Sequence, residues 1–90
     1  MVADATEELI GRITHYYSKL SVGIIELTAG ELNVGDVIRV KGKHTDFTQT
    51  VDSMQIEHQD VRHADKGKSV GIKVKEKVRE HDQVFRCGTP

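Results

Sequence analysis

The sequence has little of several features that would mark particular classes of protein. A single cysteine, Cys87, excludes a disulfide bond within the chain. No segment approaches the ~20 apolar residues needed to span a bilayer, so we expect no membrane partner. The first eight residues carry three acids and no apolar run, which is unlike a signal peptide. These absences together predict a cytoplasmic protein.

Aromatic residues and proline are also scarce. Tryptophan is absent, proline occurs once, and aromatic residues make up 4% of the 90 residues. A chain of this length forms one domain, and its core must consist mainly of valine, isoleucine and leucine. Eight glycines beside one proline are typical of a β domain with many turns.

The motifs of nucleotide, metal and catalytic sites are missing as well. There is no Gly-x-x-x-x-Gly-Lys-Ser/Thr loop for phosphate, so no nucleotide is expected. The five histidines and Cys87 lack the spacings of zinc ligands. Cys87 beside a histidine is one alternative as a nucleophile, but it ends the last predicted strand, where a small half-buried thiol is expected. We predict no catalytic residue, no metal ligand, no cofactor and no enzyme.

Alternation of apolar and polar residues predicts a series of short strands. After a turn at Gly35-Asp36, Ile38 and Val40 alternate with cationic residues, a period of two that separates two faces of a strand. A helix over 4–13 competes with the first strand, but Gly11 and the β-forming residues after it weaken that alternative. A bulge or break is expected near residues 52–53, and 59–68 is predicted to be a charged connection. The predicted strands cover residues 9–17, 22–27, 37–41, 47–58, 69–74 and 84–87.

Six or more short strands without a convincing helix predict an all-β fold. Closing a small sheet into a barrel protects its edges, so we expect a closed or nearly closed barrel of six or seven strands. The domain should cover residues 8–87, with a leader at 1–7 and a tail at 88–90. The predicted core residues are Leu9, Ile13, Val22, Ile24, Leu27, Leu32, Val34, Ile38, Val40, Val51, Met54, Ile56, Val70, Ile72, Val74, Val78 and Phe85.

Several strings of the chain, in this order and spacing, resemble the second domain of translational GTPases. This is the β-barrel domain of elongation factor Tu, initiation factor 2 and the selenocysteine-specific factor, and the resemblance covers about residues 9–87. The GTPase domain itself has no counterpart here. The strings are Gly11-Arg-Ile13, Val22-Gly-Ile-Ile-Glu-Leu27, Gly30-Glu-Leu-Asn-Val-Gly-Asp-Val-Ile-Arg-Val-Lys-Gly42, Thr50-Val-Asp-Ser-Met-Gln-Ile56, His63-Ala-Asp-Lys-Gly-Lys-Ser-Val-Gly-Ile-Lys-Val74 and Glu80-His-Asp-Gln-Val-Phe85.

The resemblance implies a barrel of the translation-factor domain 2 type and a non-enzymatic module that contacts ribosomal or transfer RNA. In aminoacyl-tRNA carriers, the loop between the first two strands holds a Gly-Arg-Gly that helps bind the charged 3′ end. Here the corresponding stretch is Ser18-Lys19-Leu20, where a lysine replaces the planar guanidinium.

Charge supports an RNA-binding face in the second part of the chain. Residues 37–90 hold eleven bases and eight acids, whereas residues 1–36 hold two bases and six acids. If the two lysine-bearing strands are neighbours, they form a cationic stripe, and a tyrosine could stack on a base. Ordinary solvated strand faces are the alternative. The predicted RNA-binding residues are Tyr16, Lys19, Arg39, Lys41, Lys43, Lys73, Lys75 and Lys77.

A protein–protein or self-association module without RNA contact is the second hypothesis for function. The net charge of −1 favours it over a nucleic-acid coat. Adjacent apolar residues at Ile24-Ile25 and Tyr16-Tyr17 leave one of each pair for a partner or a homodimer, unless both are buried inside the fold.

Overall fold

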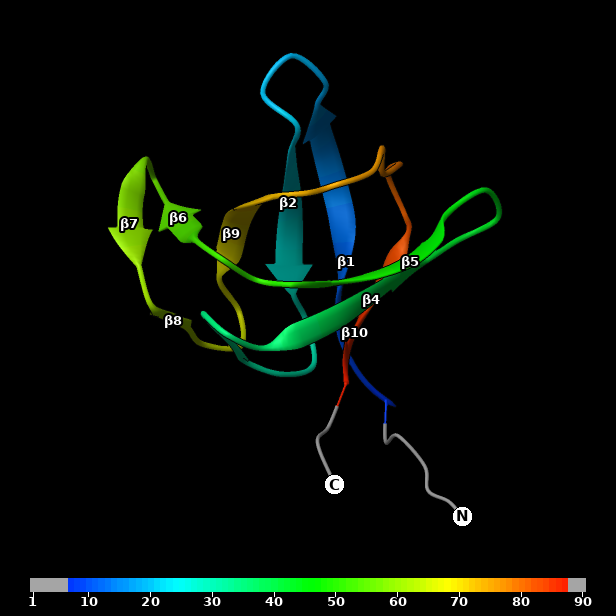
Figure 1. The fold of residues 1–90 in the computed structure, drawn as a ribbon. Coiled ribbons are helices and arrows are strands. Elements are labelled where there is room, and N and C mark those ends of the chain that lie inside the picture. Colours follow the sequence, from blue (N-terminus) through cyan, green and yellow to red (C-terminus); the bar gives the residue numbers. More distant parts are fainter. Residues whose placement is uncertain (1–6, 88–90) are drawn as a thin grey trace.

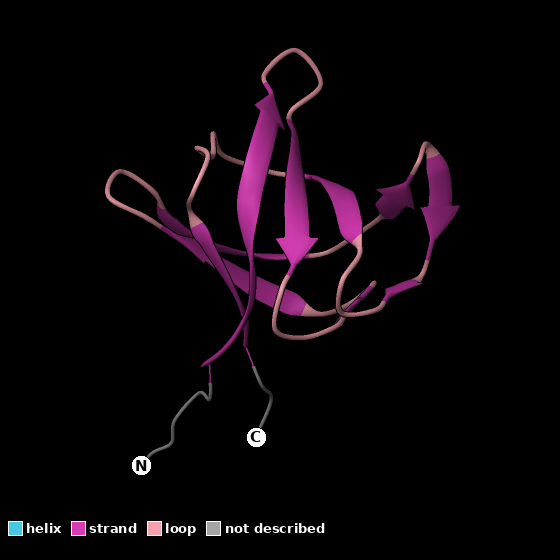
Figure 2. Cartoon of the chain, turned by 180° about the vertical axis from the view of Figure 1, so that it is seen from behind, coloured by secondary structure: helices cyan, strands magenta, loops and turns pink. Residues whose placement is uncertain are grey.

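The computed structural model describes residues 7–87, which contain strands and no helix (Figures 1 and 2). The all-β prediction is therefore confirmed. The predicted leader, apart from residue 7, and the predicted tail at 88–90 lie outside the described residues. The described part includes no helix of the length and apolarity that crossing a membrane would require. The strands are β1 (Glu7–Tyr17), β2 (Val22–Leu27), β3 (Leu32–Asn33), β4 (Val37–Lys41), β5 (Asp46–Thr50), β6 (Met54–Ile56), β7 (Gln59–Val61), β8 (His63–Ala64), β9 (Ser69–Lys73) and β10 (Gln83–Cys87).

Eight of these strands form one curved antiparallel sheet in the order β5-β4-β10-β1-β2-β9-β6-β7, and β3 pairs with β8 in a second, small sheet. In Figure 1 the large sheet wraps around the core, and the chain from β5 crosses the molecule to reach β6. The ladder is open between β5 and β7, so the predicted closed barrel of six or seven strands is wrong in closure and in strand number.

The two ends of the open sheet are connected through the turn before β4. Gly35 adopts a positive φ of 98°, which a residue without a Cβ tolerates. Its N–H donates to the Val51 carbonyl at 2.8 Å, and the Val51 N–H donates to the Asp36 carbonyl at 2.8 Å. The Val34 N–H donates to the Arg62 carbonyl at 2.9 Å between β7 and β8. The small β3–β8 sheet therefore bridges the region of β4 and the region of β7.

The core is aliphatic, as the composition predicts. In three strands, however, the residue that points into the core differs from the predicted one. Leu9 is 39% exposed whereas Ile10 is fully buried, because a bulge shifts the register of β1 between Leu9 and Gly11. In β2 and β10 the neighbouring residue points inward: Ile25 is buried in place of Ile24, and Val84 is buried in place of Phe85.

The predicted break near residues 52–53 is confirmed, since β5 ends at Thr50 and β6 begins at Met54. The predicted connection at 59–68 is wrong in its first half, which contains β7 and β8. The other expected strands match closely, and the bounds of β2 and β4 agree with the predicted ranges.

Candidate functional site

A groove of about 670 Å³ lies where β5 faces the end of β9. Thr48, Gln49 and Thr50 line one wall, and Lys73 and Lys75 line the other. These segments belong to strands that are not paired by their backbones in the sheet. The groove therefore marks the seam at which the open sheet comes back toward itself.

The side chain of Gln49 crosses this seam. Its Nε2 donates to the Lys73 carbonyl at 2.8 Å, and its Oε1 accepts from the Lys75 N–H at 2.9 Å. One donor and one acceptor on a planar amide imitate the peptide group of a neighbouring strand. A single side chain thus joins β5 to the segment after β9 without using the backbone of β5.

The backbone edge of β5 that faces the groove is consequently left open. At one end of the strand, Val51 directs its N–H and C=O toward the turn before β4. At the other end, the Gly42 N–H donates to the Thr45 carbonyl at 2.7 Å. Consecutive residues of a strand direct these groups to opposite sides, so Thr48 and Thr50 direct theirs away from β4. Within residues 7–87, neither residue has a backbone hydrogen bond on that side.

The groove carries more positive than negative charge. Lys73 and Lys75 are exposed on one wall, and Asp52 is the acid among the lining residues. Lys73 and Lys75 are two of the residues predicted to bind RNA. The third lysine of that group, Lys77, is exposed but is not among the groove residues.

Arg39 is placed differently from the prediction, because its charge is already matched. Its Nε and Nη2 both donate to Asp46 at 2.8 Å, and its Nη1 donates to the two carboxylate oxygens of Glu7 at 3.2 and 3.0 Å. The hydrogen bonds to Asp46, then those to Glu7, raise the pKa of Arg39 above its ordinary value. In return, Arg39 lowers the pKa of Asp46.

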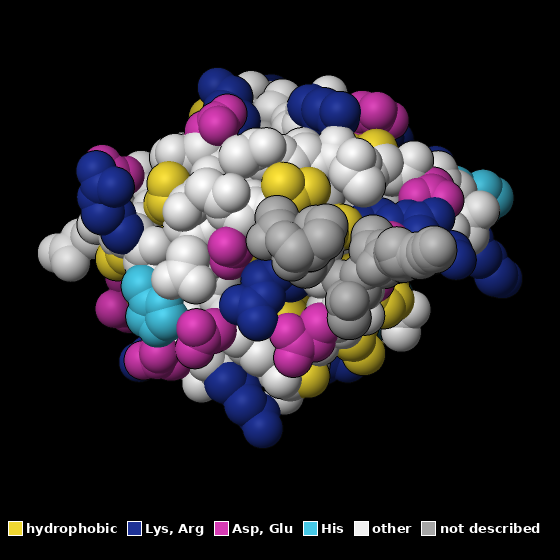
Figure 3. Space-filling model, turned by 60° about the horizontal axis from the view of Figure 1, so that its bottom comes forward, with side chains coloured by type: hydrophobic (Ala, Val, Ile, Leu, Met, Phe, Trp, Pro, Cys, Tyr) yellow, Lys and Arg dark blue, Asp and Glu magenta, His cyan; other side chains and the backbone are white. Residues whose placement is uncertain are grey.

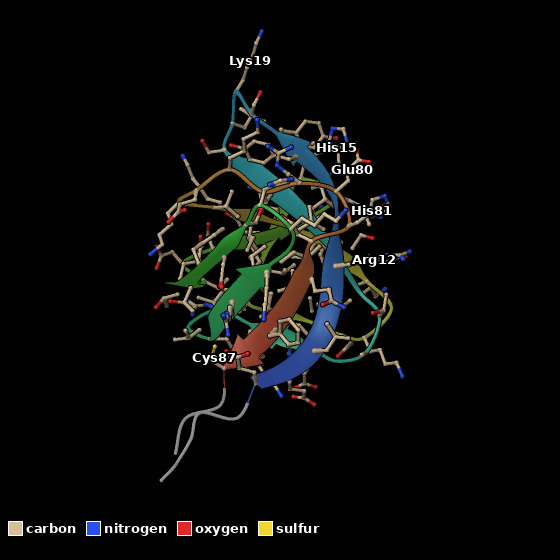
Figure 4. The ribbon with its side chains drawn as sticks, turned by 90° about the vertical axis from the view of Figure 1, so that its right-hand side faces the viewer. Arg12, His15, Lys19, Glu80, His81 and Cys87 are labelled. Carbon is tan, nitrogen blue, oxygen red and sulfur yellow. The ribbon has the colours of Figure 1, made fainter. Side chains whose placement is uncertain are left out.

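The remaining predicted RNA-binding residues come from several separate elements of the fold. In the backbone-paired order, three strands separate β9 from β4, which ends at Lys41 and is followed by Lys43. The two lysine-bearing strands are therefore not paired neighbours, as the predicted cationic stripe assumed. Lys19 projects from the loop between β1 and β2, at the end of the molecule opposite Cys87 (Figure 4). Tyr16 is half-buried against the core. On the face drawn in Figure 3, basic and acidic side chains alternate.

An apolar surface lies on the outer side of β2, near the residue pairs that suggested a protein partner. Tyr17 is 48% and Leu20 is 63% exposed. With Val22 and Ile24 they line a hollow of about 370 Å³, which also includes Gly71, the partner of Ile24 on β9. Of the adjacent pairs Tyr16-Tyr17 and Ile24-Ile25, Tyr17 and Ile24 therefore contribute to this surface.

The cysteine and the histidines are the other potentially reactive groups of the described residues. Burial, followed by the nearby charge of Glu7, raises the pKa of the Cys87 thiol, which is opposite to the shift that a nucleophilic thiolate needs. His15 lies 3.9 Å from Glu80 at the molecular surface (Figure 4). A cluster of Glu31, His63 and Asp65 had no signal in sequence spacing, because its members meet through the pairing of β3 with β8.

No known family model matches the chain. An uncharacterized protease of Methanocaldococcus jannaschii is 47% identical over 77 residues, which is 84% of this chain and 19% of that protein. A collagenase of Porphyromonas gingivalis is 40% identical over 78 residues, which is 86% of this chain and 22% of that protein. The chain thus spans about a fifth of the length of these relatives.

Among solved structures, the chain has the fold of the C-terminal domain of a candidate U32 peptidase from Geobacillus thermoleovorans. The TM-score is 0.81 at 18% identity, over 88% of this chain and 91% of that domain. The selenomethionine variant of the same domain gives a TM-score of 0.80 at 19% identity, over 86% and 96%.

These relatives correct the identity inferred from the sequence. The resemblance to the second domain of translational GTPases is wrong, because the relatives are named as a protease and a collagenase. The hypothesis of a translation module that binds ribosomal or transfer RNA falls with it. The expectation of a protein outside enzyme families is also wrong, since the relatives carry the names of enzymes.

Proposed function

We propose that this chain is the β domain of a U32-type peptidase and that its groove holds a segment of polypeptide in an extended conformation. The observation that carries the proposal is the open backbone edge of β5, where Thr48 and Thr50 face a groove whose other wall carries Lys73 and Lys75. The names of the relatives, protease and collagenase, imply that those proteins act on polypeptides.

The physical basis is the addition of a strand to an exposed sheet edge. A bound segment would exchange N–H···O=C hydrogen bonds with Thr48 and Thr50, and alternate side chains would point into the groove. Lys73 and Lys75 would favour acidic side chains at those positions. The Gln49 amide would stay in place, since its bonds run to the far wall.

The expected affinity is modest. Each backbone hydrogen bond contributes about 0.5–1.5 kcal/mol net, while association costs about 4–15 kcal/mol of lost freedom. We therefore expect a Kd on the order of 0.1–1 mM for a peptide bound to this chain alone. Such an affinity suits a domain that works beside a catalytic body, where other contacts also hold the substrate.

The apolar surface around Tyr17 and Leu20 supports attachment to a larger body. The relatives are roughly four times as long as this chain or longer, and contacts between domains commonly bury exposed apolar residues of this kind. A cytoplasmic location for this chain stays a prediction, to which its single cysteine is suited.

The test uses a pair of substitutions at one residue. Thr48→Pro removes the N–H that faces the groove and leaves the hydrogen bonds toward β4 intact, because proline is tolerated on an edge strand. Thr48→Ala is the matched control, since it removes the side chain and keeps the N–H. Binding is followed by amide NMR shifts of the chain with a ten-residue peptide of alternating glutamate and threonine.

We expect shifts at Thr48, Thr50 and Lys73 in the wild type and in Thr48→Ala, and at least a fivefold weaker binding in Thr48→Pro. Lysine in place of glutamate in the peptide should weaken binding further. The proposal fails if 1 mM peptide causes no shifts in this groove, or if a folded Thr48→Pro variant binds as tightly as Thr48→Ala. The amide spectrum of each variant reports whether it is folded.

A further inference from the structure

The outer face of the small β3–β8 sheet carries a second cluster of reactive side chains. Leu32 pairs with Ala64, and both point into the core. Asn33 pairs with His63 on the outer face. If the same register is extended by one residue before Leu32, Glu31 lies opposite Asp65. Ligand atoms of Glu31, His63 and Asp65 indeed lie within 4.8 Å of one another.

This arrangement concentrates negative charge. Two carboxylates on opposite positions of paired strands repel each other and destabilise the pairing. Within residues 7–87, the ion pair formed by these acids is the one between Asp65 and His63, with 2.6 Å between Oδ1 and Nε2. In that part of the chain, neither acid forms an ion pair with a lysine or an arginine. A cation between the carboxylates would relieve the repulsion.

The His63 ring is oriented by contacts at both of its nitrogens. Its Nδ1 lies 2.6 Å from the Asn33 Oδ1, and its Nε2 lies 2.6 Å from the Asp65 Oδ1. If Nδ1–H donates to Asn33, the Nε2 lone pair of a neutral ring faces a carboxylate. At 2.6 Å the two atoms share a proton in a hydrogen bond. A metal ion bound to both, which would hold them roughly 3 Å apart, would take the place of that proton. A second-shell acceptor on Nδ1 is the usual device that directs Nε2 to a metal.

The backbone holds the three ligands in place. Glu31 precedes the fully buried Leu32, and Ala64, which separates His63 from Asp65, is 1% exposed. The Lys68 N–H donates to the Asp65 carbonyl at 3.1 Å, which fixes the turn after β8. A site whose supporting residues are packed loses little freedom when an ion binds.

We propose that Glu31, His63 and Asp65 bind a divalent transition-metal ion, with Asn33 as a positioning residue. One imidazole and two carboxylates suit Zn²⁺ or Mn²⁺, with water completing the coordination, whereas Ca²⁺ and Mg²⁺ prefer oxygen ligands alone. The ion would tie β3 to β8 and stabilise this end of the fold. This inference is independent of the polypeptide groove, since none of these residues lines it.

The experiment titrates chelator-treated protein with Zn²⁺, Mn²⁺ and Mg²⁺. It follows the ring nitrogen signals of His63 by NMR and the Tm by calorimetry. The variants are Glu31→Gln, Asp65→Asn and His63→Gln, and all three residues are exposed, so the fold should tolerate them. The matched control is His44→Gln, which alters an exposed histidine outside the cluster.

We expect saturable binding of one Zn²⁺, a rise in Tm, and weak or no response to Mg²⁺. His63→Gln should abolish binding, and each acid variant should weaken it at least tenfold. Asn33→Ala should also weaken Zn²⁺ binding, and Asn33→Asp, which keeps an acceptor for His63 Nδ1–H, should restore it. The proposal is overturned if Zn²⁺ does not saturate, if it shifts signals of other histidines only, or if His63→Gln and His44→Gln bind alike.

Discussion

The two places where the open sheet is joined use different means. At the seam between β5 and β9, a single side-chain amide, that of Gln49, makes two hydrogen bonds to the opposite backbone. At the other place, β3 and β8 pair through their backbones over the buried Leu32 and Ala64. Backbone pairing occupies the strand edges and leaves only side chains for binding. Closure by a side chain leaves a backbone edge free, and that edge is where we place a polypeptide.

The largest effect is expected on the backbone-paired side. Leu32 is fully buried, so Leu32→Ala should lower the free energy of unfolding by about 2–5 kcal/mol through lost burial and a residual cavity. The measurement is urea unfolding followed by circular dichroism. The matched control is Thr48→Ala on the other side, where the side chain is exposed and the effect should stay within about 0.5 kcal/mol. Equal effects would show that the small sheet does not pack as part of the core.

A smaller effect is expected at the seam. Gln49→Ala removes both hydrogen bonds across it and exposes the Lys73 carbonyl and the Lys75 N–H to water, so the loss should be about 1–2 kcal/mol. Gln49→Glu keeps an acceptor for Lys75 but places an oxygen against the Lys73 carbonyl, and it should destabilise at least as much. Amide hydrogen exchange at Lys75 should become faster in both variants. Unchanged exchange there would mean that Gln49 does not join the two walls.

Parts of this contrast are readable in the sequence. A strand with apolar residues in one phase only, such as β9, shows its buried face in the sequence, and in β4 the charged Arg39 and Lys41 mark the outer face. The buried residue of β2 was mispredicted because Ile24 and Ile25 are adjacent and equally apolar. Either alternation pattern, with Ile24 or with Ile25 inside, therefore fits the sequence. β7 and β8 were missed because Gln59–Ala64 is mostly polar, and short edge strands need no apolar alternation.

The candidate sites were less predictable than the fold, because both depend on contacts between distant residues. Nothing in the sequence around Gln49 indicates that its side chain joins two strands. Its partners, Lys73 and Lys75, lie 24 and 26 positions later in the chain. Glu31 and Asp65 meet only through the register of β3 with β8. The strings that suggested a translation factor are a Gly-Asp turn and Val/Ile-rich strands. Such strings describe a small antiparallel fold better than they describe a function.

The smallest effect concerns the ion pair between Arg39 of β4 and Asp46 of β5, which we call the brace. Arg39 lowers the pKa of Asp46 through paired hydrogen bonds. A carboxyl group whose pKa is lower in the folded state than its unfolded value of ~3.9 stabilises the fold above that value. The stabilisation is lost as the pH falls through the lower, folded pKa.

Asp46 is 53% exposed and Arg39 is 28% exposed, so solvent screens the pair, and the difference should be small and should shrink at high salt. Asp46→Asn removes this titration and leaves a neutral partner for Arg39. The stability of the wild type should therefore fall more steeply below pH 4 than that of the variant, when the Tm of each is measured from pH 6 to pH 2. Parallel curves would show that the brace does not hold β5, and the open edge of that strand would then need support from Gln49 alone.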